Sequence, residues 1–281
     1  MDRNITICAT DLTVITGHNP YKSKDELILK FWKRYFKSDY LECVENLKTQ
    51  NIPLKKEETD YEVVKRIVKE NNIQLGGDLY KCFKSDNVND LTNDKSKVMK
   101  KIESSLSESK KNEFKKSFDT ITNTNFGIKY ENKGCDLYET ETNAKVVKTS
   151  KYYKTELFQI PNEYDKIDTW GIGGKIDGIL LPENKIVEIK NRVNNLFYCL
   201  RDYEKVQCFV YMFLLESEST DLVEVLKKKD DNSINIINVK FDESFWEEEI
   251  MMTFEDFISD FYIFLEDPKR KLKLISYSKS E

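Results

Sequence analysis

The sequence of 281 residues contains a single histidine, His18, and its six cysteines include no C-x-x-C pair. A catalytic triad or a zinc site built on histidines is therefore not available, and the cysteine spacing matches no metal finger. The spacing also argues against an iron–sulfur cluster held by four cysteines. We expect reduced thiols in a cytosol-like compartment. The cysteines lie at positions 8, 43, 82, 135, 199 and 208.

Long apolar runs are also missing. No stretch of 18 apolar residues occurs, and the start has no basic segment followed by an apolar one. Neither a membrane span nor a signal peptide is predicted. We expect a soluble protein inside the cell, in the cytoplasm or the nucleus, with no membrane partner.

The chain lacks a net positive charge, which is unusual for a protein that binds nucleic acid. The formal net charge is −5 and the pI is about 5.4. Local patches matter more than the total. Residues 22–37 carry six basic side chains against two acids, and residues 95–116 carry eight lysines against three glutamates. Residues 242–260 hold eight acids and no base. Each charge run could equally be a solvated helix face.

Residues 174–190 have the pattern of a β-hairpin that carries two carboxylates and an amine. Two runs of strand length, rich in β-branched and apolar residues, flank a Pro-Glu-Asn turn. Side chains alternate faces along a strand, so Glu188 and Lys190 share one face. Asp177 lies on the preceding strand, eleven residues before Glu188.

Asp177 reaches the face of Glu188 in a register that pairs Leu181 with Ile186 and leaves a four-residue loop. Two carboxylates on one face repel each other unless a cation lies between them, and oxygen ligands favour a hard ion such as magnesium. The metal would act as a Lewis acid on a phosphate, and a second ion would stabilise the leaving oxygen. Lys190 would hold or deprotonate the attacking water. An ordinary hairpin with a solvated polar face is the alternative.

Two further polar side chains interrupt predicted apolar helix faces. Residues 124–138 have a helical period, and Glu131 is the only charge on one stripe of that helix. Residues 198–216 form a second predicted helix, whose core stripe contains one amide, Gln207. A buried carboxylate needs a cation or a donor, and a core amide needs hydrogen bonds. A lysine and a backbone group could supply these partners, or both residues could serve the hairpin site.

Five motifs occur in a fixed order along residues 8–216. Together they resemble the PD-(D/E)XK nuclease superfamily and, within it, the lambda exonuclease or YqaJ-type viral recombinase family. Ile176 stands before Asp177, where the superfamily name has proline. The motifs are ITGHNPYKS at 15–23, FGIKYE at 126–131, GKIDG at 174–178, VEIK at 187–190 and EKVQ at 204–207.

The resemblance implies an α/β fold with a central mixed β-sheet flanked by helices, a restriction-endonuclease-like core, and an N-terminal helical portion. It implies a divalent metal site of Asp177, Glu188, the Ile189 carbonyl and Glu131, which hold two Mg²⁺ or Mn²⁺ ions. Lys190 matches the catalytic lysine of the family. Gln207 matches the glutamine of the following helix.

The N-terminal motif ends at a predicted helix start. Ser23 can cap a helix beginning at Lys24, and Glu26 completes a capping box. Backbone N–H groups at such a start favour an anion, so Tyr21, Lys22 and Ser23 could hold a phosphate of DNA. A loop with no ligand is the alternative. Further phosphate contacts are expected from Lys175, Arg192 and Arg201.

Three parts are expected along the chain. Residues 1–84 would be an N-terminal helical part of the nuclease fold, 85–124 a polar lysine-rich insertion, and 125–281 the catalytic core with an acidic C-terminal helix. The expected helices are 12–15, capped by Thr10 and Asp11, then 24–49, 58–71 and 243–265. The expected strands are 144–148, 151–160, 171–181, 185–191 and 233–240.

From these features we expect a metal-dependent deoxyribonuclease, most simply an exonuclease at duplex ends in recombination or in viral and mobile-element DNA processing. The end dependence, an annealing-protein partner and a ring-shaped homo-oligomer follow only from the resemblance. One alternative keeps the fold and makes the enzyme a structure-specific endonuclease or an RNA-cutting nuclease. Another is a non-catalytic module that binds nucleic acid or protein.

Overall fold

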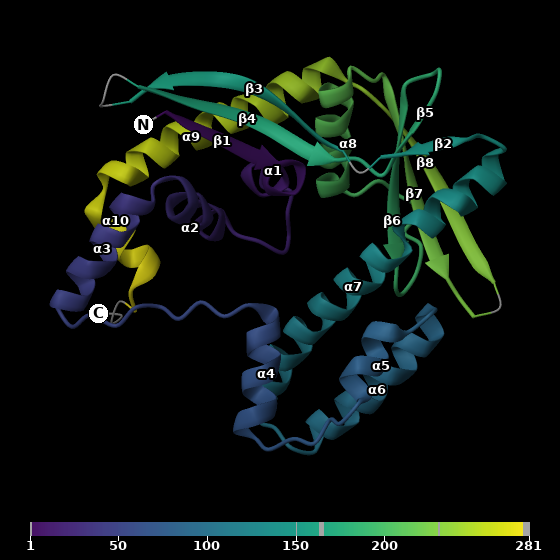
Figure 1. The fold of residues 1–281 in the computed structure, drawn as a ribbon, viewed down its shortest axis with the longest axis horizontal. Coiled ribbons are helices and arrows are strands. Elements are labelled where there is room, and N and C mark those ends of the chain that lie inside the picture. Colours follow the sequence, from purple (N-terminus) through teal and green to yellow (C-terminus); the bar gives the residue numbers. More distant parts are fainter. Residues whose placement is uncertain (1, 150, 163–165, 230, 278–281) are drawn as a thin grey trace.

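The computed structural model describes residues 2–149, 151–162, 166–229 and 231–277, and it contains two mixed β-sheets flanked by helices (Figure 1). The expected parts 1–84 and 125–281 begin and end at residues 1 and 281, which lie outside these ranges. The predicted α/β class with mixed sheets is confirmed. The described strands form two sheets rather than one central sheet.

The first sheet has three strands in the order β1-β4-β3, with β1 parallel and β3 antiparallel to β4. Helices from both ends of the chain pack against it through an aromatic core that includes Phe31, Trp170 and Phe261. The elements of this part are β1 (Arg3–Cys8), α1 (Ala9–Ile15), α2 (Lys24–Tyr35), α3 (Lys37–Thr49), β3 (Tyr152–Pro161), β4 (Ile167–Lys175), the π-helix η1 (Phe245–Met251), α9 (Met252–Glu266) and α10 (Pro268–Ile275).

The second sheet has five strands in the order β2-β5-β6-β7-β8. The helix α8 (Asp202–Leu215) connects β6 to β7. These two strands are parallel to each other, and a parallel pair requires a crossover connection of this kind. Two residues, Ile176 and Asp177, lead from β4 into this sheet. The strands are β2 (Val146–Lys148), β5 (Gly178–Leu180), β6 (Lys185–Arg192), β7 (Ser219–Lys227) and β8 (Asn232–Lys240).

Four helices form a lobe beside the second sheet: α4 (Asp60–Glu70), α5 (Asp78–Lys84), α6 (Val88–Glu103) and α7 (Glu108–Thr142). The helix α7 has 35 residues, which corresponds to a length of roughly 50 Å. Figure 1 shows it running from the lobe to the second sheet. Its first half packs in the core of the lobe and its second half packs against β6 and β7.

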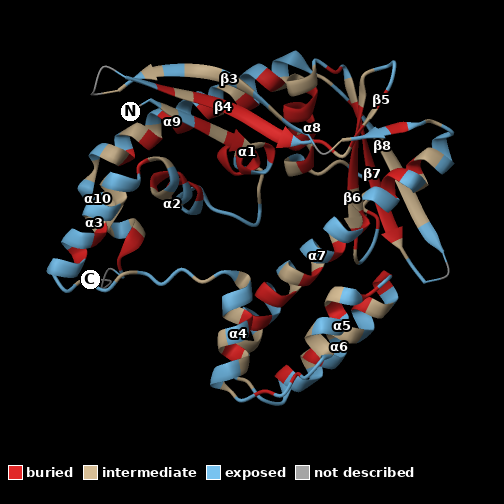
Figure 2. Ribbon diagram, viewed as in Figure 1, coloured by how far each residue is buried: buried red, intermediate tan, exposed pale blue. Residues whose placement is uncertain are grey.

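Three clusters of buried side chains hold these parts together, and Figure 2 shows buried segments on the inner faces of the helices and through the centre of both sheets. Gly134 of α7 fixes the distance between α7 and β6. A Cβ atom at Gly134 would lie 2.3 Å from Cγ2 of Ile189. The absent side chain therefore lets α7 approach the strand that carries Glu188 and Lys190.

Local signals in the sequence predict the start of α2 correctly but not the bounds of the neighbouring helices. Ser23 and Glu26 form the expected capping box at the start of α2. The predicted helix 24–49 is interrupted at Phe36, so it forms α2 and α3. The helix expected at 12–15 begins earlier, at Ala9, directly after β1. Cys8 rather than Thr10 or Asp11 is its N-cap residue.

Four elements were not predicted from the sequence: the strands β1 and β7 and the helices α5 and α6. Polar residues obscure the apolar pattern of β7, because Asp221 and Glu224 are buried there. Both acids have hydrogen-bond partners from other elements. Their tertiary partners make a buried strand possible where the sequence alone shows charge.

The hairpin of β5 and β6 is confirmed, but its predicted register is wrong. Ile179 pairs with Ile186 and Leu180 with Lys185, two positions away from the predicted pairing of Leu181 with Ile186. A shift of two residues keeps every side chain on its face, whereas a shift of one would reverse it. Asp177 and Glu188 therefore still approach each other.

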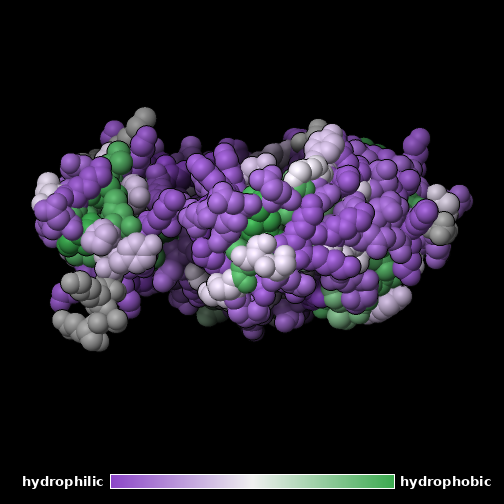
Figure 3. Space-filling model, turned by 90° about the horizontal axis from the view of Figure 1, so that it is seen from below, coloured by the Kyte–Doolittle hydropathy of each residue, from purple (hydrophilic) through white to green (hydrophobic). Residues whose placement is uncertain are grey.

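The surface seen in Figure 3 is mostly hydrophilic, with apolar atoms in separate patches. Within the described ranges, no helix has both the length and the apolar character that a membrane span requires. All six cysteines lie in those ranges and are free thiols.

Candidate active site

Asp177 and Glu188 lie side by side where β4 leads into the second sheet. Oδ2 of Asp177 accepts a hydrogen bond of 2.9 Å from the backbone N–H of Ile189. Glu188 is buried on β6. The sequence-predicted acids of the hairpin are thus brought together by the strand pairing.

Lys190 connects β6 to α8. Its Nζ donates a hydrogen bond of 2.9 Å to Oε1 of Glu188 and another of 2.9 Å to Oε1 of Gln207. Gln207 is buried on α8, and the lysine satisfies the amide oxygen that the sequence analysis singled out. The crossover helix therefore fixes the amine beside the carboxylates.

Glu131 faces Asp177 across a pocket of about 270 Å³. The close packing at Gly134 places Glu131, one helical turn earlier on α7, beside the hairpin. Lys175 and Asn132 also line the pocket, so Lys175 lies at the site as predicted. The full lining is Glu131, Asn132, Cys135, Lys148, Thr149, Lys175 and Asp177.

The three carboxylates have an excess of negative charge. Burial, together with the neighbouring Asp177 and Glu131, raises the pKa of Glu188 to about 8 against the opposing effect of Lys190. Burial also raises the pKa of Asp177, and burial with the charge of Asp177 raises the pKa of Glu131. Oε2 of Glu188 is buried and has no hydrogen-bond partner in the described part of the protein. Lys190 and Lys175 oppose these upward pKa shifts but do not cancel them.

The donor set suits a hard cation that retains water. Within the described ranges, no three His, Cys, Asp or Glu side chains form a group that could hold a metal ion by themselves. Magnesium does not require such a cage, because it usually binds one or two carboxylates and completes its shell with water and substrate phosphate. Asp177, Glu188 with its free Oε2 and the Ile189 carbonyl fit this mode. Glu131 lines the same pocket as Asp177.

Arg192 is not a phosphate contact in this structure, contrary to the expectation from sequence. The residue is 9% exposed, and its guanidinium donates to Glu204 at 2.7 and 3.0 Å and to Glu224 at 2.8 Å. Two buried carboxylates therefore occupy its donors. The residue ties β6 to α8 and β7 close to Lys190.

The N-terminal corner also differs from the expectation. The backbone N–H groups of Tyr21 and Lys22 donate to Oδ1 of Asn19, and the N–H of Ser23 donates to Glu26. These three amides are therefore engaged within the protein and do not form an open phosphate cradle. The side chains of Tyr21 and Lys22 remain exposed.

Arg201, the remaining predicted contact, lies over the ring of Phe197, with its guanidinium carbon 3.2 Å from the ring centroid. It also donates a hydrogen bond of 3.3 Å to the hydroxyl of Tyr203. The sequence analysis did not single out Phe197 or the neighbouring Tyr198. The sequence signal for this contact was the presence of Arg201 and Tyr203 two residues apart at the start of the predicted helix.

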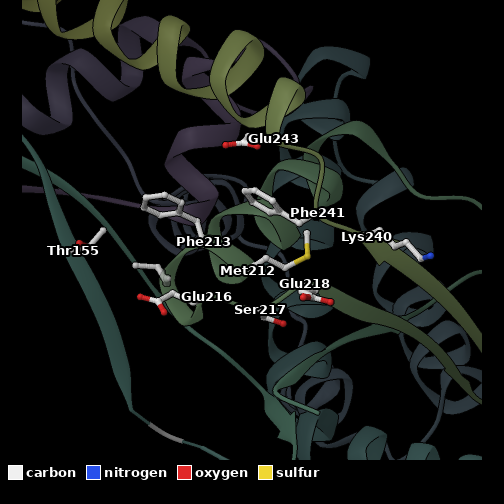
Figure 4. A pocket seen from close by; sticks show the side chains of 10 residues that line it. Thr155, Met212, Phe213, Glu216, Ser217, Glu218, Lys240, Phe241 and Glu243 are labelled. Carbon is white, nitrogen blue, oxygen red and sulfur yellow. The ribbon is translucent and has the colours of Figure 1, made fainter.

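A larger pocket of about 730 Å³ lies at the C-terminal end of α8 (Figure 4). Phe213, Phe241 and Met212 contribute apolar surface there, and three glutamates lie among its lining residues. None of the carboxylates at Lys190 lines it. The two pockets are therefore separate, and Asp177 and Glu131 line the smaller one.

Comparison with solved structures finds similar chains at low identity. An alkaline exonuclease from Laribacter hongkongensis aligns at 13% identity with a TM-score of 0.40, over 74% of this chain and 98% of that chain. Its complex with dAMP aligns at 16% identity and a TM-score of 0.38, over 70% of this chain and 92% of that chain. A phage related exonuclease from Haemophilus somnus 129PT aligns at 14% identity and a TM-score of 0.33, over 51% and 70% of the two chains.

No protein-family model and no curated protein matches the sequence. The three solved structures described above are exonucleases by name, which is the kind of protein that the motifs resemble. At such low identities and TM-scores these similarities carry no functional argument. Function is therefore inferred from the geometry of the site.

Proposed function

We propose that the protein is a metal-dependent deoxyribonuclease that hydrolyses DNA phosphodiester bonds within the cell, as an exonuclease at duplex ends. The observation that carries the proposal is the contact of Lys190 with both Glu188 and Gln207 beside Asp177. An amine held between a carboxylate and an amide, next to an orphaned carboxylate oxygen, has the parts needed for phosphodiester hydrolysis.

Asp177, Glu188 and the Ile189 carbonyl would hold Mg²⁺ or Mn²⁺, with Glu131 available to a second ion. The bound cation supplies Lewis-acid activation of the phosphate and a lowered pKa for water. Burial would lower the pKa of Lys190, but the adjacent Glu188 outweighs it and raises that pKa, so the amine carries a proton at neutral pH. Lys190 then orients the attacking water as a donor, and Gln207 holds the amine in place.

Lys175 at the pocket rim and Arg201 at the start of α8 would contact DNA phosphates. The annealing-protein partner, the homo-oligomer and a role in recombination or viral DNA processing belong to the same proposal and rest on the motif resemblance. Light scattering of the purified protein, alone and with DNA, measures the oligomeric state.

The testing experiment is digestion of end-labelled linear duplex, with and without a 5′ phosphate, beside the same sequence as a closed circle. We expect cleavage with magnesium, none with a chelator, and intact circles. If circles are nicked or linearised, the enzyme is an endonuclease and not an exonuclease. If RNA is cut preferentially, the substrate is RNA and not DNA. Absence of cleavage of any of these substrates with either magnesium or manganese would refute the proposed chemistry.

A further inference from the structure

Two large aromatic side chains are exposed near the start of α8. Tyr198 is 71% exposed and Tyr21 is 67% exposed. Tyr198 belongs to the segment between β6 and α8, whereas Tyr21 lies before α2. The ring of Tyr21 contacts the ring of Tyr203 edge to face, with centroids 5.9 Å apart. Segments far apart in the sequence therefore contribute to one surface.

Arg201 contacts the rings of Phe197, which directly precedes Tyr198, and of Tyr203. Its guanidinium stacks on Phe197 and donates to the hydroxyl of Tyr203. We call the set of Tyr21, Phe197, Tyr198, Arg201 and Tyr203 the aromatic platform. It combines open ring faces with one cation, the composition with which proteins hold unpaired nucleic acid strands.

The backbone that presents Tyr198 is held in an unfavourable conformation. Tyr198 has φ of 56°, in the left-handed region, which is unfavourable for a residue that is not glycine. The carboxylate of Glu224 accepts the backbone N–H of Tyr198 at 2.9 Å and that of Phe197 at 3.1 Å. Glu224 is in turn held by Arg192 and Asn235. A buried network therefore enforces the exposure of this ring.

The platform adjoins the proposed active site. Arg192, which anchors it, follows Lys190 by two residues on β6. Tyr203 precedes Gln207 by about one turn of α8. A strand whose phosphate lies at the carboxylates would therefore have its neighbouring bases within reach of these rings.

We propose that the aromatic platform stacks the unpaired bases of a DNA strand at the active site, with Tyr198 and Tyr21 as the stacking rings. The inference rests on the proposed function, since it assigns the part of the substrate next to the cleaved bond. Stacking tolerates any base because every base has a π-face. The platform therefore confers a preference for unpaired ends without a preference for sequence.

The test uses fluorescence anisotropy of a labelled oligothymidylate with a chelator present, so that binding is measured without cleavage. Tyr198→Gly removes the ring and suits the left-handed backbone, so the variant is expected to fold. We expect Tyr198→Gly and Tyr21→Ala each to weaken binding about 5-fold to 100-fold. Tyr198→Trp should retain binding. Tyr61→Ala is the matched control, because Tyr61 is 62% exposed on α4, within the lobe.

A second readout uses a 2-aminopurine base at the unpaired end of the oligonucleotide. Its fluorescence should be quenched on the wild-type protein and on Tyr61→Ala but not on Tyr198→Gly. The proposal is refuted if Tyr198→Gly and Tyr21→Ala bind the oligonucleotide as tightly as the wild type. It is also refuted if Tyr61→Ala loses as much binding as they do. If oligonucleotide binding depends on these rings while no substrate is cut, the platform stands and the proposed hydrolysis fails.

Discussion

Strand β6 carries two charged clusters only two residues apart, and they differ in how well their charges are paired. Arg192 lies between Glu204 and Glu224, and its donors are engaged. Lys190 lies beside Glu188, whose second oxygen has no partner among the described residues. The donors of the first cluster are engaged, whereas the second cluster contains a buried carboxylate oxygen without a partner in the described ranges.

The pKa shifts in the two clusters run in opposite directions. Burial acts to raise the pKa of Glu224, but hydrogen bonds from the backbone of Tyr198, from Asn235 and from the backbone of Phe197, together with Arg192, lower it. Burial raises the pKa of Glu188 to about 8, and neighbouring acids add to the effect. A buried acid with a full set of hydrogen-bond donors has a structural role, whereas a buried acid without them is a candidate ligand of a cation.

The largest expected effect comes from removing the amine of the unsatisfied cluster. Lys190→Ala should lower the cleavage rate by about 100-fold to 10,000-fold, because the attacking water loses its donor. DNA binding should change little. Steady-state cleavage and anisotropy measure the two quantities, with Lys240→Ala as the control since Lys240 is exposed and far from the carboxylates. Undiminished cleavage by Lys190→Ala would remove the lysine from the mechanism.

Removing the cation of the satisfied cluster should cost stability instead. Arg192→Ala leaves two carboxylates buried without their partner, which lowers the free energy of unfolding by about 3–5 kcal/mol. Urea denaturation measures this change. Arg270→Ala breaks a similar contact with Asp260 at the surface and should cost at most about 1 kcal/mol. Equal losses in the two variants would contradict the distinction drawn between the clusters.

Magnesium should stabilise only a protein that retains the unsatisfied carboxylates. At about 100 times the dissociation constant, it should add about 2–3 kcal/mol to the stability of the wild type. Glu188→Gln should lose this gain, because it removes the carboxylate whose second oxygen has no partner in the described part of the protein. Thermal unfolding with and without magnesium tests both statements. A Glu188→Gln protein that is as strongly stabilised by magnesium would exclude this acid as a ligand.

The smallest expected effect concerns the packing that brings Glu131 to the site. Gly134→Ala places a methyl group against Ile189 and should cost about 1–3 kcal/mol of stability and reduce cleavage by displacing α7. Gly127→Ala is the matched control on the same helix, because nothing lies within 4 Å of its added Cβ. It should be neutral or stabilise by up to about 1 kcal/mol. Similar effects at both glycines would contradict a role for close packing.

Much of the candidate site could be predicted from short stretches of sequence. The alternation of side chains along a strand places Glu188 and Lys190 together, and the observed shift in hairpin register left that relation intact. The isolated amide of Gln207 correctly indicated a specific partner, which is Lys190. The four phenylalanines of α9, at positions 254, 257, 261 and 264, recur at helical spacing and are buried.

The sequence by itself determined the helix caps, the faces of the strands and the set of polar side chains that needed partners, because these depend on residues within a few positions of one another. Only the tertiary structure decided which charges are paired. Arg192 meets acids 12 and 32 residues further along the chain, through a helix crossover and a parallel strand that local patterns do not specify. Two basic residues on one strand thus acquired different roles through the partners that folding supplied.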